Sequence, residues 1–166
     1  MNRTARRQRS IEMAKLTLVA LAMGAATFAL PAISHADTAH QKFQSPSGQI
    51  RCVLFAGGTP APEVKCQIAQ HTYAIAPGSA RNEHGEACEP ASDRGEDFWL
   101  EQGKPGSVGC TYSALDSGVG PWPTLDYGQT NSVGPLSCDS EPVGITCTDN
   151  STGDFFRVSR DSYQIG

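Results

Sequence analysis

The chain has 166 residues, with 13 basic and 17 acidic side chains and a formal net charge of −4. Five of the basic residues lie within the first 36 positions, so the remainder carries 8 basic and 16 acidic residues, a net charge of −8. Without clusters of Lys and Arg, binding to nucleic acid or to an anionic membrane is disfavoured, whereas a basic partner is compatible with this charge.

The first 36 residues have the three parts of an export signal. A basic end (Arg3 to Lys15) precedes an apolar run from Leu16 to Leu30, and Ser34-His35-Ala36 offers small residues for cleavage. The run is shorter than the roughly 20 apolar residues that span a bilayer. We therefore expect residues 1–36 to be a cleavable signal peptide, with Met13 as an alternative start. The mature protein is expected to be secreted or retained in the cell envelope, without a transmembrane segment.

The mature part lacks the apolar periodicity of a helix and instead contains short apolar or alternating runs separated by Gly, Pro, Asn and Asp. These runs are Ile50–Phe55, Val64–Ile68, His71–Ile75, Asp97–Leu100, Ser107–Tyr112, Pro135–Cys138, Val143–Thr148 and Asp154–Ser159. They predict an all-β fold, a small antiparallel sandwich or partly open barrel. We expect a flexible N-terminus over residues 37–43 and a single loop-rich β domain over residues 44–166.

All six cysteines lie in the exported part, which predicts a disulfide framework. Six cysteines allow fifteen pairings, and sequence alone does not choose among them. Intervening turns favour pairing in sequence order, because a turn returns one strand beside the other. The favoured bridges are Cys52–Cys66, Cys88–Cys110 and Cys138–Cys147. Close-spaced Cys-x-x-Cys pairs are missing, so we expect neither a metal site nor a cofactor.

Several motifs of the mature part, in order, resemble a family of small secreted six-cysteine actinobacterial (mycobacterial-type) proteins of unknown function. The motifs span about Phe43 to Tyr163 and include Ser45-Pro46-Ser47-Gly48-Gln49-Ile50-Arg51-Cys52, Val64-Lys65-Cys66, Leu125-Asp126-Tyr127-Gly128, Cys138-Asp139-Ser140, Gly144-Ile145-Thr146-Cys147 and the stretch from Thr152 to Tyr163. Asp126 departs from the family pattern, which has proline at this position. The resemblance implies secretion and the six-cysteine scaffold, and it assigns no activity.

No catalytic constellation is apparent. The Gly-x-Ser-x-Gly motif is absent, and oxidised cysteines supply no nucleophile. His71 is expected to be a structural histidine, and His84 is expected to be an exposed loop residue. The acids Asp93, Glu96 and Asp97 lie beside an aromatic pair and suggest a small hydrolase only as a third hypothesis. The oxygen-rich stretch Asp149–Asp154 lacks the glycine and glutamate of a calcium loop, so a hairpin turn is favoured there.

The aromatic residues expected to contact a partner are Trp122, held between Pro121 and Pro123, and Tyr127. Prolines preorganise an extended loop, and a preorganised Trp is typical of a recognition hot spot. An alternative is that Trp122 folds back as a lid on the core. The leading hypothesis is a monomeric, non-enzymatic secreted domain that binds an unidentified envelope or extracellular partner. An inhibitor of a secreted hydrolase, such as a lysozyme or protease, is the alternative.

Overall fold

The computed structural model describes residues 40–57, 61–115 and 120–166. Ten strands lie within these ranges: β1 (His40–Gln44), β2 (Ile50–Phe55), β3 (Glu63–Ile68), β4 (Asp97–Glu101), β5 (Ser107–Gly109), β6 (Thr130–Val133), β7 (Leu136–Glu141), β8 (Gly144–Asp149), β9 (Phe155–Val158) and β10 (Tyr163–Ile165). None of the described segments is a helix with the length and apolarity needed to cross a membrane. The predicted signal peptide and its cleavage site lie outside the described residues.

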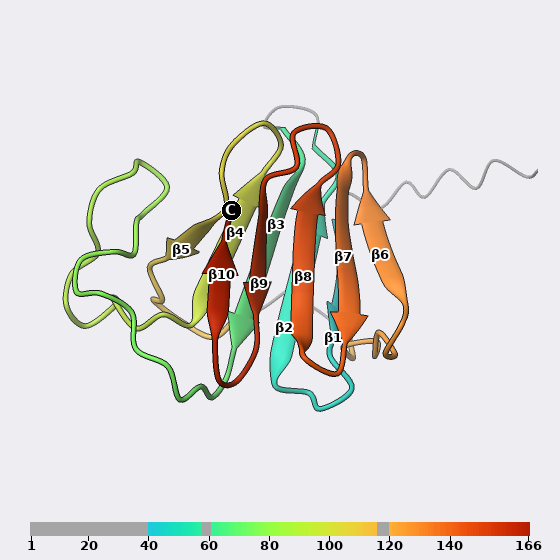
Figure 1. The fold of residues 1–166 in the computed structure, drawn as a ribbon, viewed down its shortest axis with the longest axis horizontal. Coiled ribbons are helices and arrows are strands. Elements are labelled where there is room, and N and C mark those ends of the chain that lie inside the picture. The colour runs from blue at the N-terminus through green and yellow to red at the C-terminus, as the bar shows by residue number, and fades with distance from the viewer. Residues whose placement is uncertain (1–39, 58–60, 116–119) are drawn as a thin grey trace, which may run out of the picture. The chain divides into compact units, whose positions relative to one another are not determined.

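The ten strands form two antiparallel sheets, and in each of them consecutive strands are neighbours (Figure 1). One sheet has the order β1-β2-β3-β4-β5, and the other has the order β10-β9-β8-β7-β6. Most paired strands are joined by short turns, as expected for short runs separated by turn-forming residues, but residues 69–96 form a long connection between β3 and β4. The predicted all-β, disulfide-stapled fold is confirmed, and it takes the form of a sandwich of two sheets.

The core lies between the two sheets because alternate residues of each strand point toward it. The burial of β3 and β8 alternates residue by residue along their whole length. Across the interface the rings of Phe98 and Phe156 have centroids 5.7 Å apart, and both side chains are fully buried. One contiguous cluster of buried residues therefore joins both sheets.

Three disulfides link Cys52 to Cys66, Cys88 to Cys110, and Cys138 to Cys147, which are the pairs expected from the sequence. Two of them join residues that face each other directly, Cys52 on β2 with Cys66 on β3, and Cys138 on β7 with Cys147 on β8. Each of these disulfides therefore ties two neighbouring strands within its own sheet.

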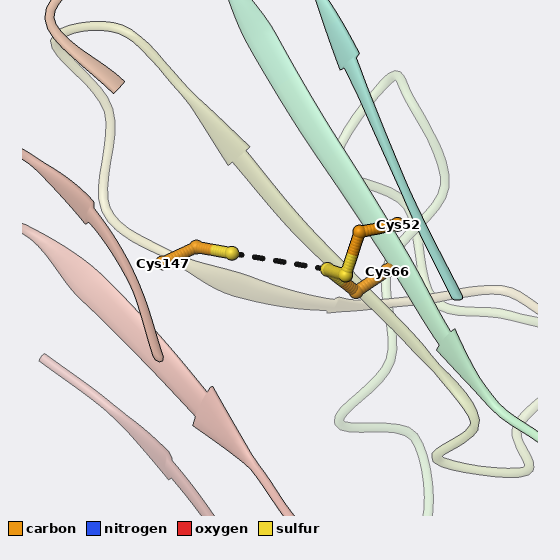
Figure 2. Close-up of side chains that lie close together, drawn as sticks. All are labelled: Cys52, Cys66 and Cys147. Atoms are coloured by element: carbon orange, nitrogen blue, oxygen red, sulfur yellow. Dashed lines mark hydrogen bonds between the residues drawn. A yellow bond between two sulfur atoms is a disulfide. The ribbon is translucent and has the colours of Figure 1, made fainter. Parts of the chain in front are cut away.

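These two disulfides meet in the core, where Cys66 Sγ lies 3.8 Å from Cys147 Sγ (Figure 2). Neither sulfur carries a hydrogen, so the dashed line in the figure marks a packing contact between two oxidised pairs. The sulfurs of Cys52, Cys66 and Cys147 all lie within 4.8 Å of one another. Because each is in a disulfide, none is the thiolate that binds a metal.

Two sequence-based expectations are corrected. Residues 40–43 were expected to be flexible, but they belong to β1, which pairs with β2 along its full length and buries Phe43. The run His71–Ile75 is not a strand. Its alternating side chains instead pack locally: the Tyr73 hydroxyl donates to the Gly95 carbonyl, and the His71 ring stacks on Tyr73 with centroids 4.1 Å apart. His71 is thus a structural histidine.

Candidate functional site

The outer face of the sheet β1-β5, which points away from the core, carries the two tryptophans of the chain. Strand register aligns one row of outward positions across all five strands: Lys42, Val53, Lys65, Trp99 and Ser107. Trp99 is half-buried in this row, whereas its neighbours Phe98 and Leu100 point into the core. The row thus presents an aromatic and two cationic side chains outward.

The second tryptophan reaches this face through the segment 120–125, which we call the strap. Gln44 at the end of β1 donates its amide to the Pro123 carbonyl at 2.8 Å, and its own carbonyl accepts the Leu125 amide at 2.9 Å. These two bonds form a short parallel bridge between Gln44 and Thr124. The strap therefore runs along the edge strand β1, and Pro121 and Pro123 stiffen it on either side of Trp122.

The Trp122 ring lies beside two cations of β1 and β2. Lys42 Nζ is 5.6 Å and the Arg51 guanidinium carbon is 5.4 Å from the ring centroid, within the range of cation–π attraction. Lys42 also donates to the Gly120 carbonyl at 3.1 Å. Trp122 itself is half-buried. Val53, which shares this outward face, is only 1% exposed although it lies outside the main core cluster.

Tyr127 lies elsewhere. Half of its surface is exposed, and it lines a pocket of about 640 Å³ together with Ser45, Val143, Arg157 and Arg160. Trp122 does not line this pocket. The two residues that sequence analysis grouped as one contact are therefore placed in different surroundings.

Trp99 forms part of a groove that sequence analysis did not identify. One side of its indole lies against β5, because a Cβ added at Gly109 would come within 2.4 Å of Trp99 Cε2. The groove has a volume of about 740 Å³, within the usual range of small-molecule sites. It is lined by residues of β3, β4 and β5, by the β4–β5 turn and by residues 81–85. Glycine at position 109 is thus needed for the indole to lie flat on the sheet.

One wall of the groove is a tight loop held in place by a disulfide. Asn82 Oδ1 accepts the backbone amides of His84 and Glu86, both at 2.9 Å, and Gly85 adopts a φ of +80°. An Asn side chain that caps its own loop in this way fixes the backbone. The Cys88–Cys110 bridge then ties the loop to the end of β5. The wall is therefore preorganised.

The three acids that suggested a hydrolase each bind a different partner. Asp93 accepts the backbone amides of Gly78 and Ala80, and Glu96 pairs with Arg94 at 2.8 Å. Asp97 accepts the Gln67 side-chain amide at 2.7 Å. The partners of Asp93 are backbone groups of a neighbouring loop, which is a structural role. The stretch from Asp149 to Asp154 forms the β8–β9 hairpin turn, with Gly153 at a φ of +88°.

The Asp97 carboxyl, on this outer face, should make the stability of the domain depend on pH. Burial raises the pKa of its carboxyl from 3.8 to about 6, against the opposing hydrogen bond from Gln67. Because the folded state binds this proton more tightly, ionisation of Asp97 lowers stability as the pH rises through this range. As the pH rises from 3 to 7.5, we expect the free energy of unfolding of Asp97→Asn to increase by about 2–3 kcal/mol relative to that of wild type.

Urea denaturation at several pH values measures this difference. Glu89→Gln, which neutralises an exposed carboxylate, is the matched control and should follow wild type across the series. A constant difference between Asp97→Asn and wild type from pH 3 to pH 7.5 would contradict a raised pKa at Asp97.

No protein-family model matches the chain, and no curated protein or solved structure shows significant similarity to it. The function must therefore be argued from the geometry of the domain.

Proposed function

We propose that the chain is a secreted, disulfide-stabilised binding domain that recognises a partner in the cell envelope or outside the cell. Its recognition surface would be the outer face of β1–β5, with Trp122 as the main contact. Three disulfides are typical of proteins that work in oxidising compartments. The basic and apolar leader and the resemblance to small secreted six-cysteine proteins support the same compartment.

The observation that carries the proposal is the strap. Two backbone hydrogen bonds to Gln44 and two flanking prolines hold Trp122 before any partner arrives. A preorganised aromatic side chain loses little conformational entropy on binding, which leaves more of its contact energy as affinity. Arg51, exposed beside the ring, adds guanidinium donors for oxygen atoms of a partner.

Trp122→Ala should weaken partner binding by about 30-fold or more, the effect of losing a hot-spot side chain. The measurement is co-sedimentation of the mature, oxidised domain with isolated cell-wall material, together with affinity capture from culture supernatant. The dissociation constant is then determined for each partner recovered. Tyr112→Ala is the matched control, because Tyr112 is an aromatic side chain that is 72% exposed and lies outside the strap.

Partners that bind Trp122→Ala and wild type with equal affinity would refute the role of Trp122. Absence of any partner for the oxidised wild-type domain, in both fractions, would refute the proposed function as a whole. Retention of the three disulfides, checked by mass spectrometry, is required of each variant so that a lost scaffold is not mistaken for a lost contact.

A further inference from the structure

The groove over Trp99 is lined by other residues than the strap. Its base is the indole, which lies on the backbone of β5 at Gly109. Glu63, Lys65 and Glu101 rise from β3 and β4 around it, and Glu83 stands on the opposite wall. Lys65 Nζ lies 5.1 Å from the centroid of the indole. The base is thus aromatic and the rim is polar, and a ligand that stacks on the ring takes the place of the Lys65 ammonium there.

The charges of the groove balance within the protein. Glu63, Glu83 and Glu101 are matched in number by three cations, which are Lys65, Arg81 and Lys104. Lys65 Nζ lies 2.9 Å from Glu63 and 3.6 Å from Glu83, which spans the groove from strand to loop.

The remaining cations are also satisfied. Lys104 pairs with Glu101 at 2.7 Å, and the Arg81 guanidinium donates to the carbonyls of Gly78 and Ala80. A groove neutralised in this way offers no net charge to attract an ionic ligand.

The paired carboxylates still offer hydrogen-bond acceptors. Each ionised carboxylate has about four lone-pair sites, and one ion pair uses only part of them. A ligand with several hydroxyl groups and no charge would satisfy these acceptors. It would also meet the indole with an apolar C–H face, because the negative face of an aromatic ring attracts the positive edges of C–H bonds.

We infer that the Trp99 groove binds a ring of a neutral oligosaccharide, which stacks on the indole and donates hydroxyl hydrogen bonds to Glu63 and Glu101. This inference rests on the proposed function, for which it names a class of partner. A pyranose ring combines an apolar C–H face with a rim of hydroxyl groups, and both match the groove.

The row of outward residues also indicates how a longer chain would lie. Trp99 is on β4, while Trp122 lies against Lys42 of β1 and Arg51 of β2 on the same face. With neighbouring strands about 4.8 Å apart, the two rings are separated by roughly 10–15 Å across the sheet. An oligosaccharide of several units, laid across the strands, would reach both rings, so affinity should rise with chain length.

The test uses the oxidised mature domain and neutral oligosaccharides of glucose, N-acetylglucosamine and mannose, each from two to six units. Binding is measured by calorimetry and by amide shifts in NMR spectra. Wild type is expected to bind at least one series, more tightly as the chain lengthens. Because the ligand is neutral, its affinity should change less than twofold between roughly 50 and 500 mM salt.

Trp99→Ala should reduce this affinity at least tenfold, and Trp99→Phe, which keeps an aromatic base, should reduce it less. Glu101→Gln removes a carboxylate of the rim without changing the side-chain volume, and it should reduce the affinity about threefold to tenfold. Tyr112→Ala should bind as wild type. Trp122→Ala should weaken the six-unit ligand while leaving the two-unit ligand unaffected.

Two results would overturn the inference: no binding of any neutral oligosaccharide by wild type, or binding that Trp99→Ala leaves unchanged. If envelope material still binds in a Trp122-dependent manner, the proposed function stands and only the carbohydrate assignment fails. If envelope material and supernatant also yield no partner, both are refuted.

Discussion

Replacing both Cys52 and Cys66 with alanine is expected to lower the free energy of unfolding by about 4–5 kcal/mol. The disulfide closes a sequence separation of 14 residues, and restricting the unfolded chain to that extent contributes about 3 kcal/mol. The remainder comes from packing, because both side chains are buried in the core. Such a loss rivals the whole stability of a small domain.

The contact between the two core disulfides makes this replacement more costly than loop length alone suggests. Cys66 Sγ packs at 3.8 Å on Cys147 Sγ, so removal of one pair leaves the other without its neighbour across the core. The Cys88–Cys110 bridge closes a longer separation of 22 residues, but Cys88 is only half-buried and this bridge does not belong to the core contact. Chain entropy alone would make its removal the costlier change.

We therefore expect the Cys52→Ala/Cys66→Ala variant to be less stable than Cys88→Ala/Cys110→Ala, by about 1 kcal/mol. Denaturant titration under oxidising conditions measures both. The reverse order would show that chain entropy outweighs sulfur packing. Double variants are required, since a single Cys52 replacement would leave the Cys66 thiol beside the Cys138–Cys147 disulfide, where exchange could form a Cys66–Cys147 bond and release Cys138.

The fold class was predictable because period-two burial leaves a direct trace in the sequence. In β3 every second residue is apolar or cysteine and is buried, and β8 follows the same pattern except that its third buried residue is Asp149. The turn residues between the strands also indicate local hairpins, which place Cys52 opposite Cys66 and Cys138 opposite Cys147. Cys88 lies in the long connection between β3 and β4, and its pairing with Cys110 follows once the other two pairs are formed. The edge strands β1, β6 and β10 were missed. β1 and β6 contain one apolar residue each, and β10 is only three residues long, so none of them shows a clear alternating pattern.

The candidate site was only partly predictable. Trp122 stands out by its prolines, but nothing in the sequence shows that the strap pairs with Gln44, about 80 residues earlier in the chain. Trp99 was not among the residues expected to contact a partner. Strand alternation could have placed it on the opposite face from Phe98, and Gly109 explains why it lies flat. The loop wall depends on long-range contacts that local patterns do not encode.

Asp149→Ala should destabilise the domain by about 2–4 kcal/mol, although Asp149 belongs to no proposed binding surface. Its side chain is fully buried, and its carboxylate connects the two sheets. One oxygen accepts the Ser151 amide at 2.8 Å and the Ser151 hydroxyl at 2.5 Å. The other accepts the Gly103 amide at 2.7 Å, from the β4–β5 turn that borders the Trp99 groove. Alanine would leave these donors without their acceptor.

Asp149→Asn distinguishes hydrogen bonding from packing, because asparagine has nearly the same shape but retains only one acceptor oxygen. We expect it to lose about half as much stability as alanine. The hydrogen bonds from Ser151, and further ones from Gly103 and Thr152, lower the pKa of the Asp149 carboxyl. The stability that Asp149 contributes is therefore present above its unfolded pKa and is lost as the pH falls through the lower folded value.

The difference in the free energy of unfolding between wild type and Asp149→Ala should accordingly be largest at pH 7 and should shrink in strongly acidic solution. This pH trend is opposite to the one expected for Asp97. Denaturant titrations of the three proteins across pH provide the measurement. Equal stability of Asp149→Asn and wild type at pH 7 would show that one acceptor suffices. Since the Gly103 bond holds the β4–β5 turn, loss of this bond would also loosen one border of the groove. Accelerated amide exchange at Gly103 and Lys104 is then expected in Asp149→Ala but not in Asp97→Asn.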